Sequence, residues 1–414
     1  MRHQTKFKQT EIGKIPEDWE VEKIKEVITK LGDGLHGTPK YDDSGNYYFV
    51  NGNNLVNGKI EVNRATKKCS KEEFEKYKRE LSNRTIFVSI NGTLGNIALY
   101  NNEKIILGKS VCYFNVKNEY NLLFIKYILK NRTFQNHIHS NATGTTIKNV
   151  SLKQMREFKF GIPRNSNEQQ SIAKILSDLD AKIELNNQMN KTFETIGQAL
   201  FKRWFVDERK DDWGIKKLGD YVDIIKGVSY RSDELKESNK ALVTLKSMNR
   251  GGGLNKNGFK EYIGEYKKEQ EIIDGDIVVA CTDLTQKAEV IGRPAIVRKI
   301  SKYEAIIASL DLAIIRPKDE RFNKAFLYYL LSSEDFQNHV QGFTNGTTVL
   351  HLSSKAIPEY IFSFSNSGLI SKFGELIKPL LNRKRDNEAQ TELLIQIRDS
   401  LLPKLMSGEI RINH

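Results

Sequence analysis

This chain has few of the residues that build disulfides, metal sites or membrane spans. Its 414 residues include three cysteines, Cys69, Cys112 and Cys281, and none has a second cysteine or a histidine at metal-ligand spacing. We therefore expect neither a zinc site nor a disulfide framework, and a reducing cytoplasm fits this composition. The first twenty residues lack the apolar core of a secretion signal, and no stretch approaches eighteen consecutive apolar residues. The sequence thus predicts a cytoplasmic protein with no membrane-spanning segment and no membrane partner.

Catalytic signatures are also missing. The sequence has no GxxxxGK[ST] phosphate loop and no HExxH zinc helix. It also lacks the Pro-Pro tetrapeptide and the Pro-Cys dipeptide that mark DNA methyltransferases. Gly251, Gly252 and Gly253 lie in a polar stretch, which is typical of a surface turn. We therefore predict no catalytic residue, no metal site and no cofactor in this chain.

The charge balance is strongly basic. Lysine and arginine number 65 against 52 acidic residues, a net charge of +13, while 39% of the residues are hydrophobic and 28% are charged. The hydrophobic content is ordinary for a folded protein and excludes intrinsic disorder. The excess of cations is spread along the chain and favours a polyanionic partner such as nucleic acid, with a membrane surface or plain solubility as alternatives.

The sequence repeats itself at a long spacing. Residues 134–138, Phe-Gln-Asn-His-Ile, recur as Phe-Gln-Asn-His-Val at 336–340, and Gly-Thr-Thr at 144–146 recurs at 346–348 with the same offset of 202. Asp18-Trp19 matches Asp212-Trp213 at an offset of 194. The change of offset predicts a net insertion in the second copy, in a loop.

Each copy ends in a long helical pattern. Apolar residues recur in a 4-3 alternation between residues 172 and 204 and again between residues 373 and 405. Both patterns become polar in the middle, at Asn186 and Asn190 and at Lys384, Asn387 and Thr391, and polar seam residues specify a partner at a cost in stability. We therefore expect the two helices to pair with each other, parallel or antiparallel; the alternative is that each packs only on its own half. The predicted seam residues are Leu176, Leu179, Ile183, Asn186, Phe193, Leu200, Ile377, Leu380, Asn387, Leu394 and Leu401.

Mixed strand and helix patterns fill each copy. Residues 85–90, 105–107, 111–116, 276–280 and 305–315 are short apolar runs that read as strands, and residues 120–136 and 323–340 have helical periodicity. The predicted fold is α+β, with two repeated domains, each built on a curved antiparallel sheet, and two long helices that pair as a coiled coil. The predicted domains are residues 1–165, 166–208 as the central helix, 209–366, and 367–414 as the C-terminal helix.

Four motifs occur in a characteristic order. They are Gly13-Lys14-Ile15-Pro16-Glu17-Asp18-Trp19; Gly161-Ile162-Pro163 followed by Glu168-Gln169-Gln170-Ser171-Ile172; Leu179-Asp180-Ala181-Lys182-Ile183-Glu184; and Leu401-Leu402-Pro403-Lys404-Leu405-Met406-Ser407-Gly408-Glu409-Ile410. Together with the duplication, they make the chain resemble the specificity subunit of type I restriction-modification systems over almost its whole length. The second copy departs from the pattern, because no Pro and no Glu-Gln-Gln introduce its helix, and we expect Pro403 to bend or end that helix.

The resemblance implies a non-catalytic subunit with two target recognition domains. Each domain would read one half of a bipartite sequence in double-stranded DNA, and the helices would be spacers that set the gap. The implied partners are two methyltransferase subunits, which methylate adenine, and restriction subunits that cleave DNA with ATP. S-adenosylmethionine, ATP and magnesium would belong to those partners.

Loops that follow strands are the candidates for DNA contact, with an ordinary turn as the alternative at each position. In the first copy these candidates are His36, Thr38, Lys40, Tyr41, Asn91, Gly92 and Thr93; in the second they are Ser229, Tyr230, Arg231, Thr282, Asp283, Gln286 and Lys287. Gly144, Thr145 and Thr146 repeat as Gly346, Thr347 and Thr348, so we expect a task common to both copies: phosphate contact by a turn, or helix capping by threonine.

Two other functions remain open at this point. One is a two-domain nuclease or transferase with an unrecognised active site, which would turn over substrate alone with a metal or cofactor. The other is a scaffold whose basic halves bind protein.

Overall fold

The computed structural model describes residues 6–285, 287–319, 322–364 and 367–412. It consists of two compact units, one of residues 1–185 with 390–414 and the other of residues 186–389. Each unit contains one globular half and part of both long helices. Among the described residues, no helix is both long and apolar enough to cross a bilayer.

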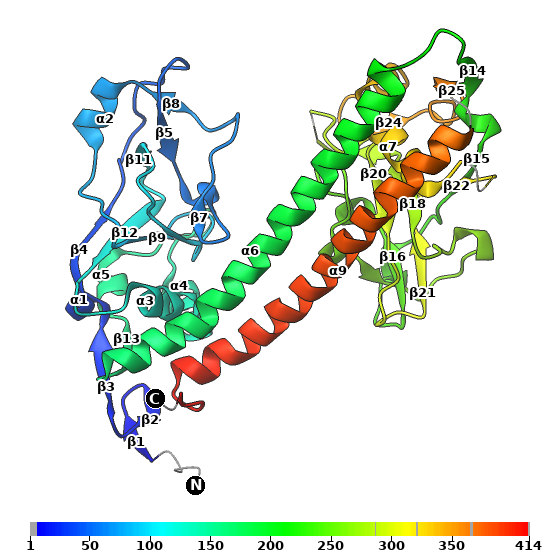
Figure 1. The fold of residues 1–414 in the computed structure, drawn as a ribbon. Helices are drawn as coiled ribbons and strands as arrows, with labels where there is room; N and C mark the ends of the chain where they lie inside the picture. Colours follow the sequence, from blue (N-terminus) through cyan, green and yellow to red (C-terminus); the bar gives the residue numbers. More distant parts are fainter. Residues whose placement is uncertain (1–5, 286, 320–321, 365–366, 413–414) are drawn as a thin grey trace. The chain divides into compact units, whose positions relative to one another are not determined.

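The first unit is built on two sheets (Figure 1). Four antiparallel strands lie in the order β10-β9-β12-β4, and three lie in the order β11-β5-β8, in which β11 and β5 are parallel. Two-stranded pairs join β1 to β2, β3 to β13, and β6 to β7. The strands are β1 Phe7–Thr10, β2 Gly13–Pro16, β3 Trp19–Lys23, β4 Ile28–Asp33, β5 Tyr47–Val50, β6 Leu55–Val56, β7 Lys59–Ile60, β8 Lys68–Cys69, β9 Thr85–Ser89, β10 Ile97–Leu99, β11 Ile105–Leu107, β12 Val111–Val116 and β13 Lys159–Pro163.

The second unit repeats this plan. Its four-stranded antiparallel sheet has the order β15-β22-β18-β20, and its three-stranded sheet has the order β17-β16-β21, with β16 and β21 parallel. β14 pairs with β25, as β3 pairs with β13. The strands are β14 Gly214–Lys217, β15 Val222–Lys226, β16 Lys240–Val243, β17 Lys260–Glu261, β18 Asp276–Ala280, β19 Thr282–Asp283, β20 Pro294–Val297, β21 Ala305–Ala308, β22 Leu312–Pro317, β23 Thr344–Asn345, β24 Leu350–Leu352 and β25 Ile361–Phe364.

The prediction of one antiparallel sheet in each half is therefore wrong in part. Each half has a four-stranded sheet and a three-stranded sheet that contains a parallel pair, and the second half adds an antiparallel sheet in the order β19-β24-β23. The central strands β9 and β18 are buried at every residue, so they show continuous apolar runs rather than alternation. The run 305–315 forms two strands, β21 and β22, because the chain turns at residues 309–311.

The helical stretches of each half are also divided. Residues 120–136 were predicted as one helix, but α3 (Leu122–Lys130) ends at Asn131 and α4 (Arg132–Asn141) follows it directly. In the second half, α7 (Lys324–Ser332) and α8 (Glu334–Gly342) are separated by Ser333. Both separating residues are extended, with ψ of 148° and 151°. One extended residue changes the helix direction without breaking the apolar periodicity, so the sequence pattern did not show it. The shorter helices are α1 Ile24–Val27, α2 Lys71–Tyr77 and α5 Leu152–Arg156.

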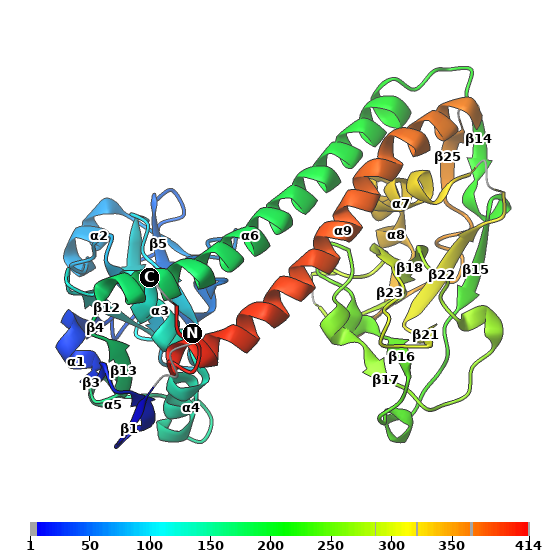
Figure 2. The ribbon, with the colours of Figure 1, turned by 60° about the horizontal axis from the view of Figure 1, so that its bottom comes forward.

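The long helices are α6 (Ser166–Lys202), which continues as a π-helical turn at Arg203–Asp207, and α9 (Ser367–Met406). Pro403 does not end α9, because the helix continues to Met406. Pro379 also lies inside this helix, although a proline there removes one backbone hydrogen bond. Helix α3 lies beside the start of α6 in the first unit, and α7 lies beside α9 in the second (Figures 1 and 2).

The helices run antiparallel within each unit. In the first unit, Asp180 of α6 accepts a hydrogen bond from Arg398 of α9 at 2.9 Å. In the second unit, Lys384 of α9 donates to Glu194 of α6 at 2.7 Å. Asn387 also donates to Asn190 at 2.9 Å. Residue 180 thus pairs with 398, 190 with 387 and 194 with 384. The numbers fall along α9 as they rise along α6, which is the antiparallel direction.

The predicted seam residues are buried or half-buried throughout. Leu176, Asn186, Ile377 and Asn387 are at most 2% exposed, and the other seam residues are intermediate. Asn186 donates from Nδ2 to the backbone oxygen of Asn387. Both helices also enter the cores of the globular halves, α6 through Ile172 and Phe201. The alternative that each helix packs only on its own half is therefore wrong, because the helices contact each other as well as the halves.

Candidate functional site

Loops from distant parts of the first half meet at one edge of its large sheet. Strands β4 and β9 end at this edge, and β12 begins there, because β12 is antiparallel to both. The turn between β11 and β12 reaches the same edge. An isolated bridge joins Asn91 to Asn149 and adds the segment 143–149. We call these four segments, residues 34–41, 90–95, 108–110 and 143–149, the first loop cluster.

Backbone hydrogen bonds fix the first loop cluster. Leu35 donates to the oxygen of Leu107 at 2.7 Å, and Lys109 donates to the oxygen of Leu35 at 3.0 Å. Gly34 lies so close to the turn that an added Cβ would be 2.3 Å from the oxygen of Gly108. Only glycine allows this approach. Because the turn is held by these backbone contacts, they also fix the position of Lys109 within it.

The second half has the same backbone arrangement. Val228 donates to the oxygen of Ala308 at 2.7 Å, and Leu310 donates to the oxygen of Val228 at 2.7 Å. A Cβ on Gly227 would be 2.1 Å from the oxygen of Ser309. Residues 227–231, 281–285, 287–293, 309–311 and 345–351 form the second loop cluster. In this cluster Leu310 has the backbone position that is equivalent to that of Lys109 in the first half.

The insertion predicted from the change of offset lies largely inside the second loop cluster. Asn91 to Gly95 spans five residues in the first half, whereas the corresponding segment, Thr282 to Gly292, spans eleven. Both glycines donate to the strand before them, Gly95 to Ser89 and Gly292 to Ala280. The second half therefore carries a longer loop on the same anchors.

Asp283 holds this longer loop in place. Its carboxylate is fully buried and accepts backbone N–H groups from Thr285, Val290 and Ile291 at 2.6–3.0 Å. Burial alone would raise the pKa of Asp283, but these donors lower it below its ordinary value. Three of the positions at which the Asp283 carboxylate can accept a hydrogen bond are thus used inside the loop, and DNA contact by this residue stays a prediction.

The repeated Gly-Thr-Thr segments form equivalent hairpin tips. Gly144 and Gly346 have φ of +97° and +112°, and a Cβ on either would lie within 2.3 Å of the oxygen three residues later. Thr143 bridges Asn149, and Asn345 of β23 pairs with His351 of β24, again at an offset of 202. The threonines at 145–146 and 347–348 are exposed. Helix capping by threonine is wrong in the first half, because Ser151 caps the following helix α5.

The repeated Phe-Gln-Asn-His segments support the loop clusters from behind. Gln135 donates to the oxygens of Gly95 and Leu129, and Gln337 donates to those of Gly292 and Leu331. The glutamine thus ties the helix pair to the loop after the central strand in both halves. This repetition reflects a structural task, which explains why the glutamine is the same in both halves while the turn residues Lys109 and Leu310 differ.

Side chains in the first loop cluster surround a shallow hollow. Its lining includes His36, Asn91, Lys109 and Asn149, and its volume of about 280 Å³ lies below the ~300–1,000 Å³ range of small-molecule pockets. His36 Nε2 lies 2.6 Å from an oxygen of Asp33 at the end of β4. A hollow of this size, lined by a lysine, a histidine and two asparagines, suits contact with a surface or a base edge rather than a small-molecule ligand.

Predicted residues outside the hollow extend the first cluster. Thr38 and Lys40 are exposed, and Tyr41 is 45% exposed, with Lys67 Nζ 5.7 Å from its ring centroid. Gly92 and Thr93 are exposed beside the Gly-Thr-Thr tip, because Gly92 donates to the oxygen of Lys148.

The predicted residues of the second cluster have mixed environments. Ser229, Arg231 and Lys287 are exposed, whereas Tyr230 is partly buried against the smaller sheet. Burial raises the pKa of Tyr230. Arg231 forms an ion pair with Asp233 at 3.2 Å. Gln286 lies outside the described residues.

Several residues of these clusters escaped the sequence prediction. Lys109 and Leu310 lie in turns between two strands, and Asn149 and His351 lie in short bridges after the Gly-Thr-Thr tips. Lys109 could have been found, because residues 105–107 and 111–116 were both predicted as strands and the residues between them must form a loop. Leu310 could not, because it lies inside the single apolar run 305–315. The bridges give no sequence signal.

Reactive and metal-binding groups are scarce in the part of the chain that the structure describes. No group of three or more His, Cys, Asp or Glu side chains there could hold a metal ion. Burial raises the pKa of Cys281, beside the second loop cluster, to about 12, so its thiol is protonated at neutral pH.

Comparison with known proteins decides the family. The family model described as "Type I restriction modification DNA specificity domain" matches residues 16–195 and again 210–366. The chain belongs to this family. It is therefore a DNA specificity subunit, which confers sequence choice without catalysing a reaction and needs no cofactor of its own.

Relatives of the family match the chain over nearly its full length. The type I restriction enzyme MjaIX specificity subunit of Methanocaldococcus jannaschii is 26% identical, covering 99% of this chain and 98% of the relative. The HindI specificity subunit of Haemophilus influenzae is 23% identical, covering 70% and 77%. The crystal structure of the S subunit from M. genitalium has a TM-score of 0.59 and 19% identity, covering 94% of this chain and 96% of that one. The last likeness shows a shared fold.

The motifs that carry the family resemblance are mostly structural in this specificity subunit. Gln169 donates to the oxygen of Pro163 at 2.9 Å and accepts from Asn121 N–H. Glu168 and Asp18 both bind Arg411, which lowers the pKa of Asp18. In the second half, which lacks Glu-Gln-Gln, Asn323 instead donates to the oxygen of Ile370 at 2.9 Å. A backbone acceptor thus replaces the glutamine.

Proposed function

We propose that each loop cluster reads one half of a bipartite sequence in double-stranded DNA. The observation that carries this proposal is the pairing of one backbone scaffold with two different sets of side chains. Reading two different half-sites requires different side chains on the same frame, because base edges are distinguished by donors, acceptors and methyl groups. The exposed Gly-Thr-Thr tips are the same in both halves, which suits contact with the phosphate backbone that every sequence shares.

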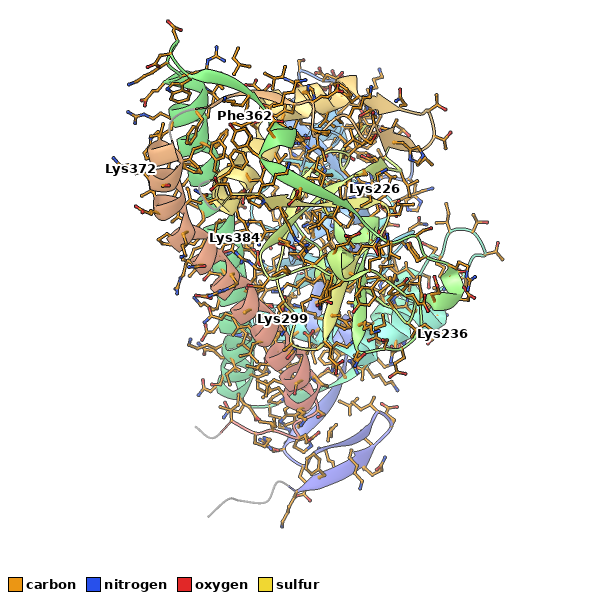
Figure 3. All side chains as sticks on the ribbon, turned by 90° about the vertical axis from the view of Figure 1, so that its right-hand side faces the viewer. Lys226, Lys236, Lys299, Phe362, Lys372 and Lys384 are labelled. Carbon is orange, nitrogen blue, oxygen red and sulfur yellow. The ribbon has the colours of Figure 1, made fainter. Side chains whose placement is uncertain are left out.

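The charge of the chain supports the same partner. A net charge of +13 favours phosphate contacts, and such contacts weaken as salt rises. Lys226, at the end of β15, and Lys236, in the loop that follows it, lie on the side of the second half away from α9 in Figure 3. Lys226 is close enough to Cys281 for its charge to oppose the rise of that thiol's pKa, so a cation lies beside the second loop cluster.

The proposal extends to the assembly. The chain would direct two methyltransferase subunits, which methylate adenine with S-adenosylmethionine, and restriction subunits that cleave with ATP and magnesium. Its own parts would be target recognition domains at residues 1–165 and 209–366, with spacer helices at 166–208 and 367–414 that set the gap between half-sites. The complex would act in the cytoplasm, where the cell's DNA is its substrate.

Methylation mapping tests the proposal. DNA from cells that express the partner methyltransferase with this chain, and without it, is sequenced by a single-molecule method that detects methyladenine. We expect a bipartite methyladenine motif with a fixed gap only when the chain is present. An active methyltransferase that shows no such motif would contradict the proposed function.

A further inference from the structure

The two loop clusters differ most sharply at the turn that follows β11 in the first half and β21 in the second. Lys109 and Leu310 have equivalent backbone hydrogen bonds, to the oxygens of Leu35 and Val228. Lys109 is exposed at the edge of the first hollow. Leu310 is 53% exposed, although the last residue of β21 before it and the first residue of β22 after it are fully buried. A cation in one half is thus replaced by an apolar side chain in the other.

A second exposed leucine lies on the neighbouring loop. Leu284 is 68% exposed and lies two residues after Thr282. The Thr282 hydroxyl donates to the carboxylate of Asp311 at 2.8 Å, and Asp311 directly follows Leu310. The loops that carry the two leucines are therefore tied together at the same edge of the sheet. Two large apolar side chains at one functional edge are not explained by core packing.

Thymine offers the apolar group that such leucines could contact. Its 5-methyl group is the apolar feature of the major groove, whereas guanine presents the O6 and N7 acceptors that lysine binds. The polar and charged residues on the loops of the two leucines, Thr282 and Asp311, suit the groove of DNA better than an apolar protein interface.

Resting on the proposed function, we propose that Leu310, with Leu284 on the loop joined to its turn, packs against a thymine 5-methyl group in the half-site read by the second half. Lys109 at the equivalent position donates to guanine acceptors in the first half-site. The turn after β11 and β21 is thus a specificity-determining position in both halves, and its side chain sets the base that is preferred there.

Uracil substitution isolates the methyl group. Once the motif is mapped, duplexes are made in which each thymine of the second half-site is replaced in turn by uracil, and binding by the chain assembled with its methyltransferase is measured. We expect one replacement to weaken binding about fourfold, as loss of one buried methyl group predicts. The Leu310→Ala variant should bind the thymine duplex several-fold more weakly and should not distinguish thymine from uracil at that position.

Ile273→Ala is the matched control. Ile273 is 60% exposed in the same unit but precedes β18, at the opposite end of that strand from Leu284. This variant should retain the full preference for thymine. A second half-site without thymine, or a methyl effect of equal size in Leu310→Ala, would overturn the inference while leaving the proposed function intact. Loss of the methyltransferase from Leu310→Ala in gel filtration would assign the leucine to a protein contact and overturn it too. Absence of any chain-dependent bipartite motif would overturn both.

Discussion

The first and second loop clusters share a backbone and differ in side chains. Gly34 and Gly227 allow the same close approach, and Gln135 and Gln337 anchor the same loop from behind. On this frame Lys109 of the first half corresponds to Leu310 of the second, and His36 corresponds to Ser229. A five-residue segment of the first half corresponds to one of eleven residues in the second. The comparison teaches that the residues that fix the loop backbone are the same in both halves, whereas the side chains at the turn differ.

The largest expected effect comes from breaking the frame in one half. In Gly227→Val the new side chain would collide with the backbone oxygen of Ser309, and overpacking of this kind costs about 2–3 kcal/mol. We expect calorimetry to show a destabilised second unit, and methylation mapping to show loss of the second half-site alone. Gly342→Val is the control, because nothing lies within 4 Å of a Cβ at that position, which is in the same half but outside its loop cluster. Loss of both half-sites in Gly227→Val would show that the frames are not independent.

The next largest expected effect, on stability, comes from removing the Asp180 carboxylate inside the first unit. Burial alone would raise the pKa of Asp180, but Lys130, Arg398 and Lys126 lower it below its model-compound value of 3.8. Asp180→Asn leaves these cations without their carboxylate and should reduce the free energy of unfolding by about 2 kcal/mol at pH 7. Because the folded pKa is depressed, the stabilisation is complete above pH 3.8 and is lost as the pH falls through the folded value.

Denaturant titrations of the wild type and Asp180→Asn at several pH values check this sign. The difference between the two proteins should shrink below pH 3.8. Asp178→Asn, which changes an exposed carboxylate on the same helix, should alter stability by less than ~0.5 kcal/mol. A difference that grows toward low pH would contradict the role given to Asp180.

Lys109→Ala sharpens the comparison at the loop tips. Removing a base contact costs about 1–3 kcal/mol and relaxes specificity at one position, so we expect about tenfold weaker binding that is confined to the first half-site. Lys104→Ala, just before β11 at its other end, should leave base preference unchanged. If Lys109→Ala weakened binding to all sequences equally, the lysine would be a phosphate contact.

The smallest effect should be the same in both halves. Thr145→Ala and Thr347→Ala each remove an exposed hydroxyl from an equivalent tip, and we expect each to weaken binding severalfold without changing base preference. Binding to scrambled duplexes should weaken by the same factor. A change in the recognised sequence in either variant would assign these tips to base recognition.

The sequence predicted the duplication, the α+β class and the two long helices because apolar periodicity and repeated motifs record them directly. It missed the parallel pairs β5–β11 and β16–β21, since pairing between distant strands leaves no local pattern. It identified loops such as 91–93 as candidates but overlooked Lys109 and Leu310, whose importance appears only when the halves are compared by hydrogen bonds. Asp283 lies in a loop, as predicted, but the fold turns its carboxylate inward, which no local sequence pattern shows.

Methylation mapping with one variant in each half tests the central claim most directly. The wild type, Lys109→Ala and Leu310→Lys are each expressed with the partner methyltransferase, and the methylated sequences are read from genomic DNA. We predict a bipartite motif whose first half alone relaxes in Lys109→Ala and whose second half alone changes in Leu310→Lys. A single continuous motif, or a change in both halves from either variant, would contradict the assignment of one half-site to each loop cluster.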